Sequence, residues 1–229
     1  MIKAKIMLNT SLSILALSIS ACAITPKTPP VIKSAEQNNA FISGVVKGDK
    51  YIAMDNSFTI NLPYKKGSRE YELMEIDEFY SEKGAHVSFG VQGKNSNIFN
   101  LEIKAILDEN TFEQQSAKLL TQYRSDLFLD YRSKPRLLKK YKFKIRGYDA
   151  IHWNLFQKIS PQQATNLGYG LVNHQVFAIN LGDKVAFIWV QKTANKANQH
   201  NKIVTAYDFA TSLSIPKKNV DVNLLSSIQ

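Results

Sequence analysis

The sequence has 229 residues, a formal net charge of +10, 44% hydrophobic residues and a single cysteine. This length and apolar content are sufficient for one globular domain and exclude a wholly disordered chain. A single cysteine excludes a framework of disulfides within the chain.

The first 21 residues have the pattern of a secretory signal peptide. Lys3 and Lys5 precede an uncharged, mostly apolar run over residues 6–21, and a positive start followed by an apolar run with a small-residue end is typical of export signals. The run is too short and too rich in serine for a membrane-spanning helix, which needs about 20 mostly apolar residues. We therefore expect residues 1–21 to be removed.

The only cysteine stands at the end of this run. The stretch ISAC (19–22) resembles the lipobox of bacterial lipoproteins. That resemblance implies that Cys22 receives a diacylglyceryl group, that cleavage occurs before it, and that the new amino terminus is acylated. Two or three acyl chains would anchor the protein stably, because one chain binds only marginally. Ala23 implies the outer membrane, with the domain facing the periplasm; the alternative is an ordinary signal peptide with a chance cysteine.

Residues 22–48 are predicted to form a flexible tether that carries the lipidated cysteine. Prolines at positions 26, 29 and 30 oppose regular strand pairing there. A flexible chain of ~26 residues has a root-mean-square span of about 28 Å, so the domain could reach partners beyond the membrane surface. The domain is predicted over 49–216, and residues 217–229 are predicted to be a polar tail.

Most of the predicted domain consists of paired strands. Each pair of apolar segments is joined by residues rich in Gly, Asn and Asp, which favour turns. The pairs are 51–54 with 58–62, 86–91 with 98–106, 140–145 with 150–156, and 173–179 with 185–191. The stretch 185–190 is apolar at every position, which predicts a central strand covered on both faces.

Two segments, 111–135 and 201–216, are predicted to contain helices. Their apolar residues recur at steps of three and four, which places them on one helix face. Thr111 with Gln114 fits a capping box, and Pro135 ends the first helical pattern. Helices on both faces of a mostly antiparallel sheet predict an α+β fold, arranged as an α/β/α sandwich.

The order of these elements resembles a PsbP-like (Mog/PsbP/DcrB-type) domain. The segments that carry the resemblance are FTINLP (58–63), the long helix, GYDAIHW (147–153), HQVFAINLGDKVAFIWV (174–190) and DFATSLSIP (208–216). Such domains occur in PsbP photosystem subunits, a Ran-binding nuclear factor and bacterial envelope proteins. The resemblance covers about residues 50–216 and implies a non-enzymatic binding or assembly module.

No catalytic, metal or cofactor motif is recognisable. The sequence has no G-x-S-x-G nucleophile, and its four histidines lack the spacing of paired metal ligands. We therefore predict that the protein is not an enzyme and has no metal site or cofactor. His152 and His174 fall in predicted strands, either as ordinary half-buried histidines or as neighbours; an enzyme would require them to converge with an acid such as Asp149.

The segment Tyr64 to Lys83 is highly charged, and we expect an inserted, solvated loop. Its acidic residues could indicate a cation site, but they lack the alternating Asp/Asn pattern and central glycine of a calcium loop. These residues are Glu70, Glu72, Glu75, Asp77, Glu78 and Glu82.

A basic stretch over 131–148 contains no acid. Period-two alternation places one set of cations on one face of a strand, opposite Tyr141, Phe143 and Ile145. The cations are Lys140, Lys142, Lys144 and Arg146. They could be a solvated outer strand that resists edge-to-edge aggregation, or a surface for an anionic partner such as lipid head groups, lipopolysaccharide or an acidic protein.

Together these features predict a membrane-anchored envelope lipoprotein that acts as a non-catalytic binding or assembly factor. The expected partners are the membrane, through the lipid, and another envelope protein or an anionic envelope surface. Nucleic acid suits the charge but not the location. The alternative is a binding module or carrier for a small anionic or lipidic ligand, which would require a deep apolar pocket between sheet and helix.

Overall fold

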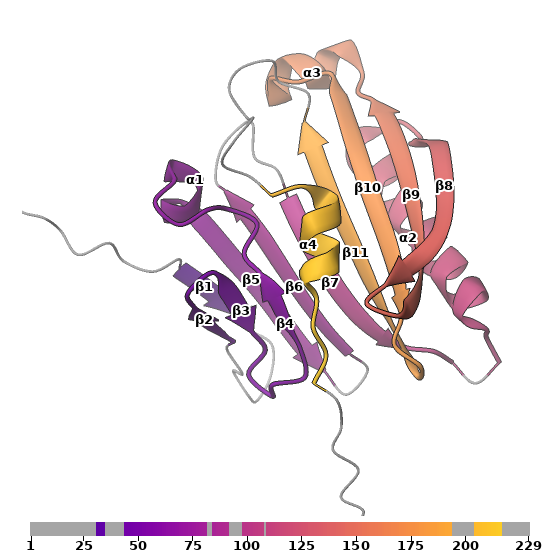
Figure 1. The fold of residues 1–229 in the computed structure, drawn as a ribbon. Helices are drawn as coiled ribbons and strands as arrows, with labels where there is room; N and C mark the ends of the chain where they lie inside the picture. Colours follow the sequence, from indigo (N-terminus) through magenta and orange to yellow (C-terminus); the bar gives the residue numbers. More distant parts are fainter. Residues whose placement is uncertain are drawn as a thin grey trace, which may run out of the picture.

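The computed structural model describes residues 31–34, 44–81, 84–91, 98–107, 109–193 and 204–216. Its main element is an eight-stranded sheet in the order β1-β5-β6-β7-β11-β10-β9-β8 (Figure 1). The strands are β1 Val31–Ser34, β5 Met74–Ser81, β6 Gly84–Val91, β7 Ile98–Ala105, β8 Arg136–Ile145, β9 Tyr148–Lys158, β10 Leu171–Asn180 and β11 Lys184–Thr193. Neighbouring strands are antiparallel, except that β1 runs parallel to β5.

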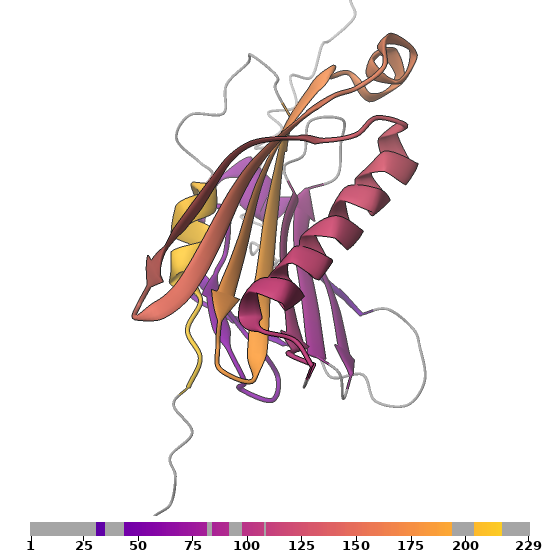
Figure 2. The ribbon, with the colours of Figure 1, turned by 90° about the vertical axis from the view of Figure 1, so that its right-hand side faces the viewer.

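The sheet is covered on both faces (Figure 2). The long helix α2 (Phe112–Tyr131) packs on one face, and α4 (Ala206–Ser212) packs on the other beside a small sheet. The small sheet consists of β2 (Val45–Lys47), β3 (Lys50–Ile52) and β4 (Thr59–Asn61). The predicted fold class, a mostly antiparallel α+β sheet with helices on both faces, is confirmed.

The central position of β11 follows from its side chains. Val185 and Phe187 pack in the α2 layer, whereas Ala186, Ile188 and Val190 pack in the layer formed by α4 and the small sheet. A strand with apolar residues on both faces can be stable only where both faces are covered. The expectation for residues 185–190 is therefore confirmed.

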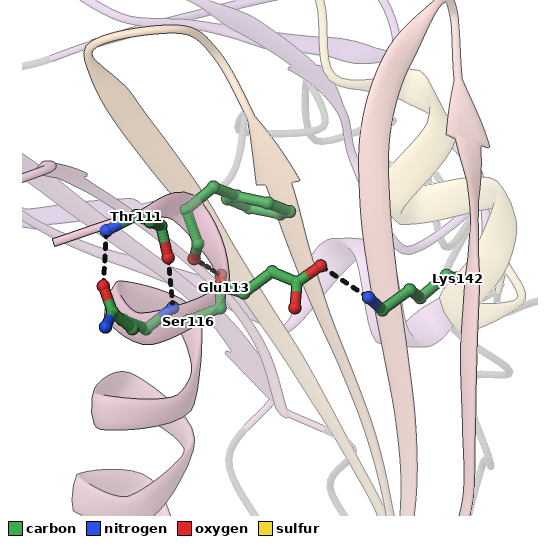
Figure 3. A network of polar contacts seen from close by, with 6 residues as sticks. Thr111, Glu113, Ser116 and Lys142 are labelled. Atoms are coloured by element: carbon green, nitrogen blue, oxygen red, sulfur yellow. Dashed lines mark hydrogen bonds and ion pairs between the residues drawn. The ribbon is translucent and has the colours of Figure 1, made fainter.

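The helix α2 begins at the predicted capping box. The Thr111 hydroxyl oxygen accepts from the Gln114 N–H at 3.3 Å, and the Gln114 carboxamide oxygen accepts from the Thr111 N–H at 2.8 Å (Figure 3). Leu119, Tyr123 and Leu127 form its buried stripe at intervals of four. The helix ends at Arg132, which adopts the left-handed conformation with φ 52°.

Removing the cap is expected to destabilise the domain modestly. The variant Thr111→Ala loses the side-chain acceptor for the Gln114 N–H, and loss of such a cap costs about 1 kcal/mol in the free energy of unfolding. Urea unfolding followed by circular dichroism would measure it. The matched control is Thr121→Ala, inside the same helix, which should not be destabilising because alanine has the higher helix propensity; equal destabilisation by both variants would contradict the capping role.

The expectation of a loop over residues 64–83 is wrong. This segment contains the short helix α1 (Arg69–Glu72) and the eight-residue strand β5, which pairs with β1 and β6. The charges mislead because β5 alternates. Met74 and Ile76 are buried between the exposed or half-buried acids Glu75 and Asp77.

Three further elements fall outside the predicted pattern. The strands β1 and β2 lie within residues 22–48, where a tether was expected, and their valines and isoleucine suit strand pairing. The helix α3 (Pro161–Leu167) precedes β10; Ser160 caps its start, and Gly168 ends it at φ 80°. Both are ordinary helix-boundary signals.

The second predicted helix is shorter than expected. In the described part of segment 201–216 the helix is α4, which Thr205 caps and Phe209 anchors with no exposed surface. Several predicted features lie outside the described residues, namely residues 1–21, Cys22, the turn over 93–97, residues 201–203 and the tail 217–229. Among the residues that the structure describes, no helix has the length and apolarity needed to cross a membrane.

Candidate binding surface

The strand β8 forms one end of the main sheet, and in the described part of the chain it pairs only with β9. A two-residue turn joins the two strands, with Arg146 at φ 49° and Gly147 at φ 88°. These angles are those of a type I′ turn, which suits the twist of a hairpin. Within β8 every residue except Phe143 and Ile145 is exposed.

Three lysines of the basic stretch, here called the lysine row, share one face of β8. Lys140, Lys142 and Lys144 lie opposite Trp153, Ile151 and Asp149 of β9. Trp153 and Ile151 belong to the layer under α2, so the lysine row stands on the α2 side. Arg146 does not continue this row, because it lies in the turn in a left-handed conformation.

Two of these lysines form ion pairs at the surface. The Lys142 Nζ lies 2.5 Å from Glu113 Oε1 at the start of α2 (Figure 3), and the Lys144 Nζ lies 2.7 Å from Asp149 Oδ1. The hydrogen bond and charge of Lys142 hold the pKa of Glu113 below its ordinary value. Side chains of the two pairs are 60% and 65% exposed, so water screens both pairs and they can exchange for other anions.

The other face of β8 is aromatic. Tyr141 stacks on His152 with ring centroids 5.8 Å apart and is 47% exposed, and Phe143 stacks on Tyr207 of α4 at 6.1 Å. At the start of the strand a bulge between Leu137 and Lys139 leaves Leu138 unpaired and 53% exposed. Lys139, opposite Asn154, shares this second face, so between the bulge and the turn the edge strand has a face of lysines and a mainly aromatic face.

His152 and His174 lie on opposite faces of the sheet. His174 faces Leu155 in the register, and Leu155 is three positions from His152, so their side chains point in opposite directions. His152 stacks on Phe177 at 4.4 Å and its Nε2 lies 2.6 Å from the Gln175 Oε1, while burial lowers its pKa. His152 and His174 therefore do not converge as an acid–base pair would require.

His174 belongs to a buried chain of hydrogen bonds. The Tyr123 hydroxyl lies 2.8 Å from His174 Nδ1, and His174 Nε2 lies 3.0 Å from the Gln157 carboxamide oxygen. The Gln157 amide in turn donates to the backbone oxygens of Leu127 and Ser133. Burial lowers the pKa of His174 to about 4, so the ring is neutral, and this chain fastens α2 to the sheet.

The acidic cluster is not a solvated loop, because Glu78 is only 4% exposed. The Gly44 N–H donates to both of its carboxylate oxygens at 3.0 and 2.9 Å, and the Tyr51 hydroxyl donates to Oε2. A side chain at Gly44 would collide with Tyr51, since a Cβ there would lie 2.2 Å from the hydroxyl oxygen. Glu78 therefore joins β5 to the small sheet. Its period-two spacing from Met74 and Ile76 was the signal that could have found it.

Aromatic side chains occupy the layer between the main sheet and α4. Phe209 of α4 contacts Phe99 at 5.1 Å and Phe89 at 5.8 Å between ring centroids, in edge-to-face geometry. All three are fully buried. Within the described ranges no group of three or more His, Cys, Asp or Glu is placed to hold a metal ion.

The chain is similar to several solved structures at low sequence identity. Cyanobacterial PsbP (CyanoP) from Synechocystis sp. PCC 6803 is 9% identical with a TM-score of 0.48, covering 77% of this chain and 98% of that protein. A mutant of Mog1 is 10% identical with a TM-score of 0.44, covering 74% and 96%. A Pseudomonas aeruginosa protein of unknown function is 12% identical with a TM-score of 0.34, covering 52% and 83%.

These similarities are distant and concern the fold alone. PsbP and Mog1 are among the proteins whose element order the sequence resembles. No protein-family model matches the sequence, and no curated protein matches it.

Proposed function

We propose that the protein is an envelope lipoprotein, anchored through Cys22, whose domain is a non-catalytic binding or assembly factor. The observation that supports binding is the strand β8. It ends the sheet with nearly all of its residues exposed, and it bears lysines on one face and aromatic side chains on the other. The partner in this proposal is another protein of the envelope.

The buried polar residues His174 and Glu78 hold elements of the fold together, which supports a binding role over catalysis. His174 and Glu78 are both buried, and each is held by hydrogen bonds between elements of the fold. A general acid or base must reach its substrate within hydrogen-bond distance, and neither group is at the surface. The lysines of β8, by contrast, are exposed.

The anchoring part of the proposal predicts a simple result. The variant Cys22→Ala removes the thiol that would receive the lipid. We expect it to lose incorporation of labelled palmitate and to leave the membrane fraction, because the acyl chains supply the membrane affinity. Cell fractionation with metabolic labelling would measure this, with Ser20→Ala as a control that keeps the cysteine. Equal labelling of Cys22→Ala and the wild type would contradict lipidation at this residue.

The binding part can be tested in living cells. A photo-crosslinking residue in place of Lys140, an exposed position on the lysine face of β8, should form a covalent adduct with a discrete envelope protein on irradiation. An adduct with lipid or lipopolysaccharide alone would contradict a protein partner. A correctly localised protein that forms no adduct would contradict the role of β8.

A further inference from the structure

No described strand pairs with the outer backbone of β8, which leaves it available for another strand. The two-residue turn makes Ile145 and Tyr148 a hydrogen-bonded pair, and such pairs alternate with pairs that are not hydrogen-bonded. Counting back from the turn, the N–H and C=O groups of Lys144, Lys142 and Lys140 point away from β9. Residues 139–145 lie between the bulge and the turn without interruption, an edge about 24 Å long at 3.4 Å per residue.

The side chains beside this edge define what could pair with it. In an added strand, residues opposite Lys140, Lys142 and Lys144 would share the α2 face with these lysines. Residues at alternate positions would share the other face with Tyr141 and Phe143. Carboxylates suit the first set of positions, and apolar side chains suit the second.

From this juxtaposition we infer that β8 binds an extended acidic segment of a partner protein by strand addition. The recognised sequence alternates acidic and apolar residues over about seven positions. Backbone hydrogen bonds supply affinity and the alternating side chains supply selectivity. This inference rests on the proposed binding function, for which it names the chemistry of the partner.

The existing ion pairs of the lysine row do not prevent a partner's carboxylates from binding these lysines. Glu113 and Asp149 bind Lys142 and Lys144 at exposed positions, where a partner's carboxylates can replace them at little cost. Lys140 has no ion pair within the described residues, and its charge acts on Glu113 as well. An anionic membrane surface would use the lysines but would leave the outward N–H groups without ordered partners, so strand addition uses more of the site.

The test uses the full-length lipoprotein in neutral detergent micelles and a fluorescent nine-residue peptide that alternates glutamate and valine. We compare Lys142→Pro with Lys142→Ala. Both lose the charge, but only proline also removes the outward N–H, a position that tolerates proline in an edge strand. We expect Lys142→Pro to bind at least tenfold more weakly than Lys142→Ala. A control peptide with lysine in place of glutamate should bind at least tenfold more weakly to the wild type.

A second measurement remains informative if Lys142→Pro does not fold. In the wild type, peptide binding should slow amide hydrogen exchange at Lys140 and Lys144 at least tenfold and leave the β9 amides unchanged. Equal affinity of the two variants, or unchanged exchange at these amides, would overturn strand addition. Equal binding of the lysine peptide would overturn the acidic preference. If the Lys140 crosslink captures a protein while these tests fail, binding stands and strand addition falls; if it captures none, the proposed function itself falls.

Discussion

Replacing Glu78 with alanine is expected to lower the free energy of unfolding by about 3 kcal/mol, because two buried donors lose their shared acceptor. These donors are the Gly44 N–H and the Tyr51 hydroxyl. Burial and the hydrogen bond to Glu78 raise the pKa of Tyr51 far above its ordinary value, so its hydroxyl remains a donor at every usable pH. The Tyr51 hydroxyl keeps its contact with the Tyr80 hydroxyl at 2.5 Å, so the Gly44 N–H is the donor left unsatisfied, and an unsatisfied buried donor costs about 1–3 kcal/mol.

The neighbouring Asp77 is a matched control. It is an acid on the same strand, but it is exposed, and surface substitutions usually change stability by less than about 0.5 kcal/mol. Chemical denaturation of Glu78→Ala and Asp77→Ala should therefore differ clearly. Loss of stability in Glu78→Ala should also increase amide exchange in β3 and β4, which the carboxylate helps to hold. Similar stabilities for the two variants would mean that Glu78 does not join the small sheet to β5.

Acid is expected to destabilise the domain through His174. Its pKa falls from an ordinary 6.5 to about 4 in the folded protein, because burial disfavours the charged ring. The unfolded chain therefore takes up a proton below pH 6.5 while the folded protein does so only near pH 4. The stability that the neutral ring contributes is present above pH 6.5 and is lost as the pH falls through 4. Linkage gives a loss of about 3 kcal/mol between pH 7 and pH 4.

The variant His174→Gln tests this assignment, since glutamine does not titrate. We expect His174→Gln to be less stable than the wild type at pH 7, because the Tyr123 and Gln157 partners are disturbed. Its decline between pH 7 and pH 4 should be smaller by about 3 kcal/mol. His152 contributes in the same direction, since burial also lowers its pKa, and it remains in both proteins. An identical pH dependence in both would contradict the role of His174.

Local patterns predicted the parts of the fold that depend on neighbours in sequence. The capping box at Thr111, the apolar spacing of α2 and the turn residues of the β8–β9 hairpin all act within a few positions. The strand β5 was missed because its buried acid has distant partners. Glu78 binds Gly44 and Tyr51, which lie 34 and 27 positions away along the chain; period-two spacing can place Glu78 on the buried face of a strand, but it does not show which groups satisfy the carboxylate there.

The candidate surface was predictable in composition but not in position. Period-two alternation in the sequence is enough to place Lys140, Lys142 and Lys144 on one face of a strand. That β8 ends the sheet follows from the strand order, which alternation does not encode. The two histidines show the same limit. Their strands were predicted to be close, but the register between β9 and β10 decides that the side chains point to opposite faces.

The most direct measurement is the yield of crosslinked protein at two exposed lysine positions in intact cells. One variant carries the photo-crosslinking residue in place of Lys140 on β8, and the other variant carries it in place of Lys118 on α2. We predict a discrete protein adduct at the first position and none at the second, because Lys140 lies on an edge strand whereas Lys118 lies on a helix. Equal adducts at both positions, or lipid adducts alone at Lys140, would contradict binding of a partner protein at β8.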